Sequence, residues 1–456
     1  MKIKLIAPHD QDENSISSAE TFKIQRVSLP LLAALTPAGH TVTIVDETFA
    51  PDDVDEDVDL VGITVMTDLA LRAYHLADHY RRRGVKVVMG GIHPTVLPGE
   101  ALQHADSVVV GEAEEVWTRL ISDAASGQMQ KLYRANKTRD LKGMPRPRRD
   151  LYPRPIYKGY TPFAFGVETS RGCPYDCEFC SISRVMGRGY RLRPVAEVIA
   201  EIESIDFPHL FFVDDSLGLN RAAAKKLFTA MIPLRKMWVG QGTVSLAGDL
   251  ELLRLMRRSG CQALLIGFES VQKKIQNGMK KIKNLRLDFP EAMRRFHGEG
   301  IAVLGAFVFG FDHENKDVFD QTLEFSMKYC LDGIQLRILV PFPGTRLYTR
   351  LLKEGRLFVS DWWLQGYSSK ALTFQPKGMT GDELLDGLAR LKRQIYSFGA
   401  IIKRFFGMSL RKRTATGASL YTGFNLATRK RYFKNLSDPQ PFAGAPDSIK
   451  NNRYQL

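Results

Sequence analysis

Short apolar segments alternate with helix-length segments over the first 142 residues. IKLIAP, HTVTIVDE, DLVGITVMT, VKVVMGGIHP and DSVVVGEAE each have the length and apolar content of a buried strand. Strands that alternate with helices in this way form a parallel sheet with helices on both faces. We therefore predict a doubly wound, Rossmann-like α/β domain over residues 1–142.

The carboxyl ends of these strands are the predicted ligand-binding edge, because ligands of doubly wound sheets bind beyond the strand ends. Glycines there would let a bulky, flat ligand approach the backbone. His93 has an alternative reading as a loop or structural residue, which is the usual role of a lone histidine. The candidate contacts are Thr64, Thr67, Gly90, Gly91, His93, Gly111 and Glu112.

A second alternating region follows a linker. The segment GMPRPRRDLYPRP at 143–155 contains four prolines and cannot continue a helix or a central strand. Residues 156–350 then contain FAFGVETS, HLFFVDDS, WVGQGTV, ALLIGFES, VLGAFVFGF and GIQLRILVPF, with helical patterns between most of them. Six parallel strands with outer helices predict a partial (βα)6 barrel of the TIM type.

The remaining residues, 351–456, predict a mainly helical extension with a basic tail. Thr380 is the expected N-cap of a helix whose apolar positions would pack on the barrel. Aromatic residues precede this helix and could cover the open barrel. The apolar positions are Leu384, Leu385, Leu388, Leu391, Ile395 and Tyr396, and the aromatic residues are Trp362, Trp363 and Tyr367.

The net charge of +14 is unevenly distributed, with an acidic segment at 52–59 and basic residues interleaved with aromatic ones at 403–434. This tail is either a solvated outer face or a contact for an anionic membrane surface, a lipid headgroup or nucleic acid. No segment approaches the roughly 20 apolar residues of a membrane span, and no signal peptide is evident at the start. We expect a soluble, cytoplasmic protein.

Three of the five cysteines, Cys173, Cys177 and Cys180, form a CxxxCxxC motif directly after the first predicted barrel strand. Barrel enzymes build their active sites at that end of the strands. A four-iron cubane normally takes four cysteine ligands, so three on one loop leave one iron open to another ligand. Zinc is the alternative, but its structural sites need four ligands and this segment contains no histidine. We interpret Cys261 and Cys330 as small buried apolar residues.

The motifs GCPYDCEFC, FFVDDS, GFES and PFPGT resemble those of the radical S-adenosylmethionine superfamily. GITVMT, GGIHPTVLP and VVGEAE resemble its cobalamin-binding subfamily, and the C-terminal extension is similar to that of hopanoid-methylase-like members. The resemblance implies a 4Fe-4S cluster, S-adenosyl-L-methionine and cobalamin as cofactors. It also implies reductive cleavage of S-adenosylmethionine to a 5′-deoxyadenosyl radical and an electron donor such as flavodoxin or ferredoxin.

The same resemblance assigns roles to individual residues. The three clustered cysteines would bind the iron–sulfur cluster, and the strand-end candidates of the N-terminal domain would contact cobalamin. Polar residues that end barrel strands have an alternative role as helix caps. The DxHxxG signature of the wider cobalamin family does not occur, so the lower ligand of cobalt stays unassigned. The residues implied in S-adenosylmethionine binding are Phe179, Asp214, Asp215, Gln241, Glu269 and Gly310.

The favoured reaction is methylation of an unactivated carbon in a hydrophobic or lipid-like small molecule. The alternatives are radical cyclisation, ring rearrangement or oxidation with the same cofactors, and a non-catalytic cluster or cobalamin-sensing module. Residues 1–172 contain no cysteine, which excludes a methylthiotransferase with a second N-terminal cluster. We expect peripheral contact with a membrane surface as a further property, and no nucleic-acid partner.

Overall fold

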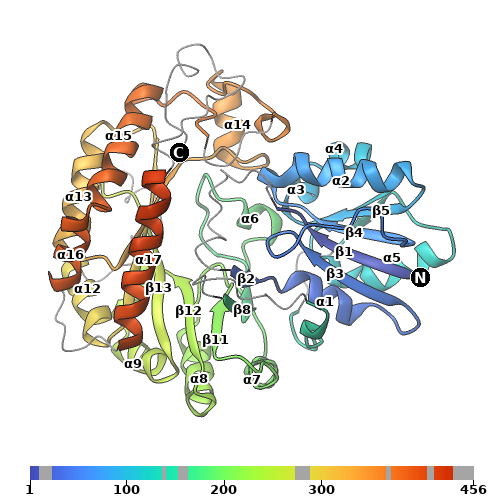
Figure 1. Cartoon of the computed structure of the whole chain (residues 1–456), viewed down its shortest axis with the longest axis horizontal. Helices are drawn as coiled ribbons and strands as arrows, with labels where there is room; N and C mark the ends of the chain where they lie inside the picture. Colours follow the sequence, from blue (N-terminus) through green and yellow to red (C-terminus); the bar gives the residue numbers. More distant parts are fainter. Residues whose placement is uncertain are drawn as a thin grey trace.

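The computed structural model shows two parallel sheets, one on each side of the molecule, with C-terminal helices along the outer side of the larger sheet (Figure 1). The structure describes residues 1–9, 23–135, 140–152, 163–272, 288–365, 371–407 and 415–434.

The N-terminal sheet has the strand order β3-β1-β4-β5-β6-β7, and all its described pairs are parallel. All five predicted strands are confirmed, and the three-residue β7 was not predicted. One core cluster contains Ile63 and Tyr74, and a second contains Leu5 and Trp117, so both faces of the sheet are covered. The strands are β1 Lys2–Ala7, β3 Thr41–Asp46, β4 Leu60–Thr64, β5 Lys86–Gly90, β6 Ser107–Val110 and β7 Leu132–Arg134.

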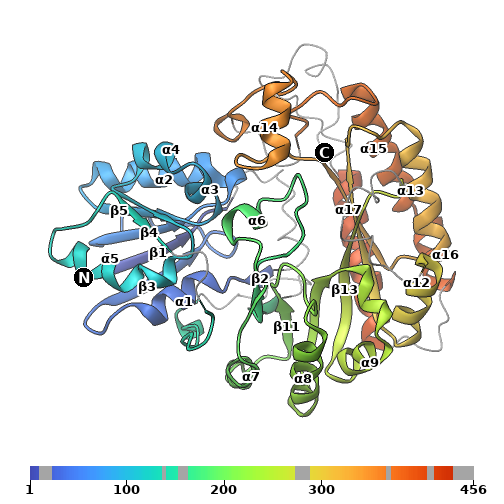
Figure 2. The ribbon, with the colours of Figure 1, turned by 180° about the vertical axis from the view of Figure 1, so that it is seen from behind.

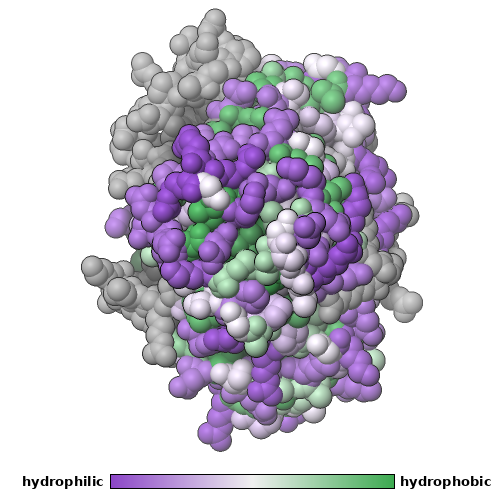
Figure 3. Space-filling view, turned by 90° about the vertical axis from the view of Figure 1, so that its right-hand side faces the viewer, coloured by the Kyte–Doolittle hydropathy of each residue, from purple (hydrophilic) through white to green (hydrophobic). Residues whose placement is uncertain are grey.

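Five helices surround this sheet, as the doubly wound prediction requires. They are α1 Ser28–Leu35, α2 Ala70–Arg82, α3 Ile92–Val96, α4 Pro98–His104 and α5 Trp117–Ala125. Figure 3 views the side of the molecule formed by this domain and shows a mostly hydrophilic surface with small hydrophobic areas. The apolar side chains of these helices are thus directed mainly toward the sheet.

The larger sheet has the order β15-β14-β13-β12-β11-β8-β2, again with every described pair parallel. All six predicted barrel strands are present, and no pairing between β15 and β2 closes the described sheet, so the barrel is partial. The six strands are β8 Phe163–Val167, β11 His209–Phe212, β12 Met237–Gly242, β13 Cys261–Glu269, β14 Ala302–Phe309 and β15 Gly333–Ile338. The helices between them are α7 Val195–Glu203, α8 Arg221–Met231, α9 Leu250–Arg258, α12 Phe289–Gly298 and α13 Asp317–Lys328.

The seventh strand, β2 Lys23–Gln25, belongs to the N-terminal part of the chain but pairs with β8 at the barrel edge. It supplies partners for backbone groups of β8 that an edge strand would leave unpaired. Gly166 permits this close approach, because a Cβ atom there would lie 2.5 Å from the Gln25 carbonyl oxygen. Three residues are too few for a period-two pattern, so the sequence did not predict this strand.

The C-terminal helices are α14 Arg346–Lys353, α15 Gly381–Ile395, α16 Phe398–Gly407 and α17 Ala415–Lys434. Helix α15 packs beside α13 on the outer side of the barrel, as Figures 1 and 2 both show. The six apolar positions predicted for the α15 region are all buried in the barrel core cluster. Thr380 caps α15 as predicted, in a capping box with Glu383.

Two features of the C-terminal region differ from expectation. Trp362 and Trp363 do not cover the barrel but pack in a core cluster of the N-terminal domain, where Trp363 Nε1 donates to Glu100 Oε1 at 3.0 Å. Arg404 is not part of a basic surface, because it is fully buried and donates to the carbonyl oxygens of Leu331 and Ile395. Tyr367 lies outside the described residues, within which no helix is long and apolar enough to cross a membrane.

Replacing Thr380 with Ala should loosen the start of α15. The Thr380 hydroxyl accepts a hydrogen bond from the Glu383 amide at 3.1 Å, and the Glu383 carboxylate accepts one from the Thr380 amide at 2.9 Å. The substitution removes the first of these two bonds. Loss of an N-cap lowers helix stability by about 1 kcal/mol. If the free energy of local opening falls by this amount, amide hydrogens in the first turn exchange about fivefold faster. Hydrogen exchange measures this, with Thr380→Ser as the matched control. Unchanged exchange in Thr380→Ala would contradict the prediction.

Candidate functional site

The three clustered cysteines lie in the loop between β9 Ser170–Arg171 and α6 Ile182–Val185. The amide of Cys180 donates to the carbonyl oxygen of Cys177 at 3.1 Å, which forms a tight turn between these two positions. The loop is entered through Gly172, whose φ of 85° suits glycine and where a Cβ atom would lie 2.1 Å from the Gly189 carbonyl oxygen. The path of the cysteine loop therefore depends on a glycine at 172.

Helix α14 holds the outside of this loop, although it lies about 170 residues further along the chain. Its Leu347 amide donates to the Glu178 carbonyl oxygen at 3.1 Å, and Arg350 Nε donates to Glu178 Oε1 at 2.6 Å. Arg346 donates to the Asp176 carbonyl oxygen at 2.6 Å. The sequence did not predict a role for either arginine, because a charged residue on an exposed helix face gives no sign of a partner about 170 residues away.

The donor set of the loop suits a four-iron cluster. Cys173 is buried, and Cys177 and Cys180 are partly exposed. No group of three His, Cys, Asp or Glu side chains among the described residues converges on a single metal ion. In a cubane each thiolate binds a different iron, and three cysteines on one loop would leave the fourth iron open to another ligand.

Three of the candidates for S-adenosylmethionine binding gather beside the loop. Asp214 is buried and accepts from the Thr169 amide at 3.1 Å and from its hydroxyl at 2.6 Å. Gln241 Nε2 donates to the Asp214 carbonyl oxygen at 2.8 Å, and Asp215 accepts from the Gly172 amide at 3.1 Å. These side chains therefore support the strand end and the entry to the cysteine loop.

Burial dominates the electrostatics of the two aspartates. It raises the pKa of Asp214, and the hydrogen bonds from Ser170 and Thr169 oppose that shift. Burial also raises the pKa of Asp215 to about 6, against the opposing bond from the Gly172 amide. Neither aspartate caps a helix, because Asn220 is the N-cap of α8. Nor does Gln241, since Asp249 caps α9, so the capping alternative is wrong for all three.

The other candidates lie at the ends of the following strands. Glu269 has a φ of 62° at an irregularity in the β13–β14 pairing, a conformation rare for a residue with a side chain. The Gly310 amide donates to Glu314 Oε2 at 2.7 Å, and burial raises the pKa of Glu314 to about 7. Sequence reasoning missed Glu314, which lies in a loop without a strand or helix signal. The Phe179 ring packs edge-on against Phe311, with centroids 5.7 Å apart.

A cavity opens between the carboxyl ends of the N-terminal strands and the cysteine-loop side of the barrel. Its empty volume is about 880 Å³, a value that includes space open to solvent. A glycine at 91 is required, because its φ is 102° and a Cβ atom would lie 2.9 Å from backbone atoms of Val65. The predicted contacts that line the cavity are Thr64, Gly90, Gly91, Gly111 and Glu112. The barrel contributes Glu168, Arg171 and Met186 to the same lining.

His93 and Thr67 were predicted with that group but are not among the lining residues. The His93 ring is fully buried, with Nε2 2.9 Å from both the Tyr74 hydroxyl and Glu100 Oε1. It also packs against Trp363, with ring centroids 5.8 Å apart. These contacts are those of a structural residue, the alternative considered from the sequence.

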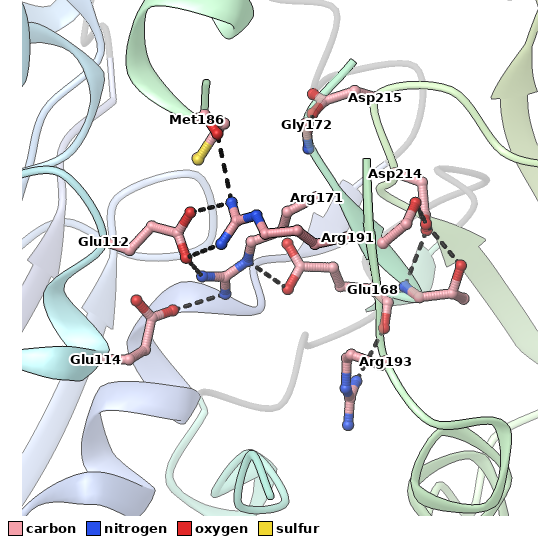
Figure 4. Close-up of polar contacts among 12 residues, drawn as sticks. Glu112, Glu114, Glu168, Arg171, Gly172, Met186, Arg191, Arg193, Asp214 and Asp215 are labelled. Carbon is pink, nitrogen blue, oxygen red and sulfur yellow. Dashed lines mark hydrogen bonds and ion pairs between the residues drawn. The ribbon is translucent and has the colours of Figure 1, made fainter. Parts of the chain in front are cut away.

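Glu112 meets two arginines where the cavity borders the barrel (Figure 4). Arg171 Nη1 lies 2.9 Å from Glu112 Oε2, and Arg191 Nη1 lies 3.1 Å from the same oxygen. Arg171 also pairs with Glu114 at 2.6 Å and with Glu168 at 2.8 Å. Burial raises the pKa of Glu168 to about 7, and the charge of Arg171 opposes the shift. Sequence reasoning did not predict either arginine.

Family models cover most of the chain in three successive parts. The Radical SAM superfamily model matches residues 167–326, and the B12 binding domain model matches residues 22–121. A domain of unknown function, DUF4070, matches residues 345–437. The first two matches contain the cysteine loop and the glycine-rich cavity, respectively.

Known proteins resemble the chain over most of its length. Bacteriochlorophyllide d C-12(1)-methyltransferase of Chlorobaculum tepidum is 30% identical over 420 residues, which cover 89% of this chain and 90% of that protein. Hopanoid C-2 methylase of Rhodopseudomonas palustris is 25% identical over 353 residues, 73% of this chain and 65% of that protein.

A solved structure shows the same fold. The radical S-adenosylmethionine methyltransferase TsrM of Kitasatospora setae, with cobalamin and a [4Fe-4S] cluster bound, superposes with a TM-score of 0.63 at 16% identity, covering 95% of this chain and 99% of TsrM. The cysteine loop, the cavity at the sheet edge and these similarities agree. The chain belongs to the cobalamin-dependent radical S-adenosylmethionine methyltransferases, enzymes that use a 4Fe-4S cluster, S-adenosylmethionine and cobalamin.

Proposed function

We propose that this enzyme methylates an unactivated carbon of an apolar, ring-containing small molecule, with electrons supplied by a donor such as flavodoxin or ferredoxin. The observation that carries the proposal is the meeting of the cysteine loop and the glycine-lined cavity at one boundary, where Glu168, Arg171 and Met186 of the barrel line the N-terminal cavity. A substrate at this boundary would be within reach of both cofactors.

When bound, the cluster and the corrinoid supply one-electron cleavage of S-adenosylmethionine and methyl transfer. The chain's own residues hold and enclose these groups. Cys173, Cys177 and Cys180 would ligate the cluster, and Gly90, Gly91 and Gly111, which line the cavity, would contact the corrinoid. Apolar side chains of the cavity, including Leu5 and Leu29, keep water away from reactive species.

The substrate class is inferred from the relatives. The two curated relatives act on bacteriochlorophyllide d and on a hopanoid, which are both polycyclic and largely apolar molecules. We therefore infer a polycyclic, predominantly apolar substrate for this chain.

A product assay separates methylation from the alternative of radical cyclisation, rearrangement or oxidation. The anaerobically reconstituted enzyme is reduced with bacteriochlorophyllide d or a hopanoid as the probe, and S-adenosylhomocysteine and 5′-deoxyadenosine are quantified. Methylation predicts both products in equal amounts together with a substrate mass increased by one methylene unit. Formation of 5′-deoxyadenosine alone, with a converted but unmethylated probe, would contradict methylation.

Replacing Gly172 with Ala should abolish cluster binding while the rest of the fold persists. The added Cβ atom would meet the Gly189 carbonyl oxygen at 2.1 Å, and the φ of 85° is itself unfavourable for alanine. We expect iron content and 5′-deoxyadenosine formation at least about tenfold below wild type. A tenfold decrease corresponds to destabilisation of the loop conformation that binds the cluster by about 1.4 kcal/mol. Iron analysis and visible spectra measure the effect.

Gly189→Ala is the matched control, because a Cβ atom at that position meets nothing within 4 Å. Its iron content should equal that of wild type. A Gly172→Ala protein that reconstitutes fully would show that the loop tolerates a different path.

Helix α16 supports a further part of the proposal, peripheral contact with an anionic membrane. Phe398, Ile402 and Phe406 are four residues apart on one face of the helix and are 58%, 54% and 63% exposed. Lys403 is exposed beside them, which suits an apolar insertion flanked by positive charge. A membrane surface would present the apolar substrate that is proposed for this enzyme.

The double variant Ile402→Glu/Phe406→Glu should lose sedimentation with anionic liposomes at low salt. Carboxylates would remove the inserted apolar groups and repel the lipid headgroups. Leu352→Glu, at a half-exposed leucine on α14, is the control and should sediment like wild type. Failure of the wild-type protein to sediment would refute the membrane contact and leave the methylation proposal untouched.

A further inference from the structure

A group of buried charges joins the two sheets at the boundary of the cavity. Arg171 and Arg191 come from the short antiparallel β9–β10 ladder, in which β10 is Arg191–Leu192, and Glu112 and Glu114 follow β6 of the N-terminal sheet. Their side chains are 8%, 14%, 3% and 8% exposed, respectively. The contact is therefore made largely out of water.

The geometry of the contact is rigid. Three different nitrogens of Arg171 pair with three carboxylates, those of Glu112 at 2.9 Å, Glu114 at 2.6 Å and Glu168 at 2.8 Å. Both carboxylate oxygens of Glu112 are engaged, one by both arginines and the other by Arg191 alone. Figure 4 shows the guanidinium of Arg171 between the three carboxylates. A planar guanidinium whose donors are all engaged has little freedom of rotation.

Stability alone is a weak explanation for these charges. Removing ionised groups from water costs several kcal/mol for each ion, and apolar residues of similar size often stabilise a protein as well as a buried ion pair does. What a buried ion pair adds is geometric specificity, since its partners tolerate only one arrangement. The network is thus better suited to fixing a relative position than to strengthening the fold.

The network of ion pairs also lies between the cysteine loop and the cavity, the two proposed cofactor sites. Arg171 precedes Gly172 and Cys173 directly, and it pairs in the β9–β10 ladder with Arg191. Glu112 follows Gly111, and both line the cavity. Only Gly172 thus lies between Arg171 and Cys173 along the chain, and Arg171 and Glu112 are themselves part of the cavity wall.

We propose that Arg171, Arg191 and Glu112 are positioning residues that set the separation between the corrinoid in the cavity and the cluster on the cysteine loop. The inference rests on the proposed function, in which both cofactors act on the same substrate carbon. Displacement of reacting groups by about 1 Å can lower a rate about a hundredfold, so a fixed separation has a direct catalytic value.

Loss of the network should loosen this boundary without separating the two sheets. A second connection exists away from the cavity, where Trp362 and Trp363 pack in the N-terminal core and Trp363 donates to Glu100. Strand β2 provides a third by pairing with β8. A variant that lacks one arginine is therefore expected to fold and to retain the cluster.

The test measures the separation directly in the holoenzyme. Protein reconstituted with iron and sulfide and loaded with hydroxocobalamin is reduced until the cluster and cobalt(II) are both paramagnetic, and pulsed electron paramagnetic resonance reports their distance distribution. Arg191→Met should give a distribution at least about twice as broad as wild type, and hydroxocobalamin should bind about tenfold more weakly. The cluster's own spectrum should be unchanged.

Arg188→Met is the matched control between α6 and β10, because the Arg188 side chain is 60% exposed and its nearest carboxylate among the described residues is that of Asp176, at 3.9 Å. It should reproduce the wild-type distribution. Glu112→Gln provides a second variant with the same expected broadening, and it decides the question if Arg191→Met does not fold.

Wild-type distance distributions in both Arg191→Met and Glu112→Gln would overturn the inference. Wild-type protein that binds no hydroxocobalamin would instead refute the proposed function itself, so the two failures are distinguishable.

Discussion

Every described strand pair in the two large sheets runs parallel, and this shared direction decides where chemistry can occur. In a parallel sheet the loops that follow the strands all gather at one edge. The strand ends after β4, β5 and β6 form one wall of the cavity, and the end of β8 forms part of the opposite wall. The cysteine loop begins a few residues beyond β8, so cluster site and cavity become neighbours.

Charged side chains are buried where the ends of the two sheets meet. Each of these side chains is paired with groups of opposite charge or with hydrogen-bond partners. Besides the network around Glu112, the fully buried Glu201 accepts from Arg149 at 2.5 Å and from Arg193 at 2.7 Å. Arg149 also donates to Gln25 of β2 at 2.9 Å. These contacts link the segment before the barrel, the added edge strand and helix α7 around the first barrel strand.

The C-terminal region stabilises the site from outside the two sheets. Helix α14 holds the cysteine loop through Arg346 and Arg350, while Trp363 is bonded to Glu100 of the N-terminal domain. Helix α15 covers the outer barrel next to α13. The C-terminal region thus contacts both cofactor-binding parts of the chain.

The sequence by itself determined five strands of the N-terminal sheet, six strands of the barrel, the capped helix α15 and the cysteine motif, because periodicity, capping and ligand spacing are local properties of the chain. Only the tertiary structure decided that β2 pairs with the barrel, that Arg404 is buried and that His93 turns into the N-terminal core. It also decided that Arg171 and Arg191 meet Glu112. An arginine has the same local pattern whether it is solvated or buried, and its partner is chosen by the meeting of segments far apart in the chain.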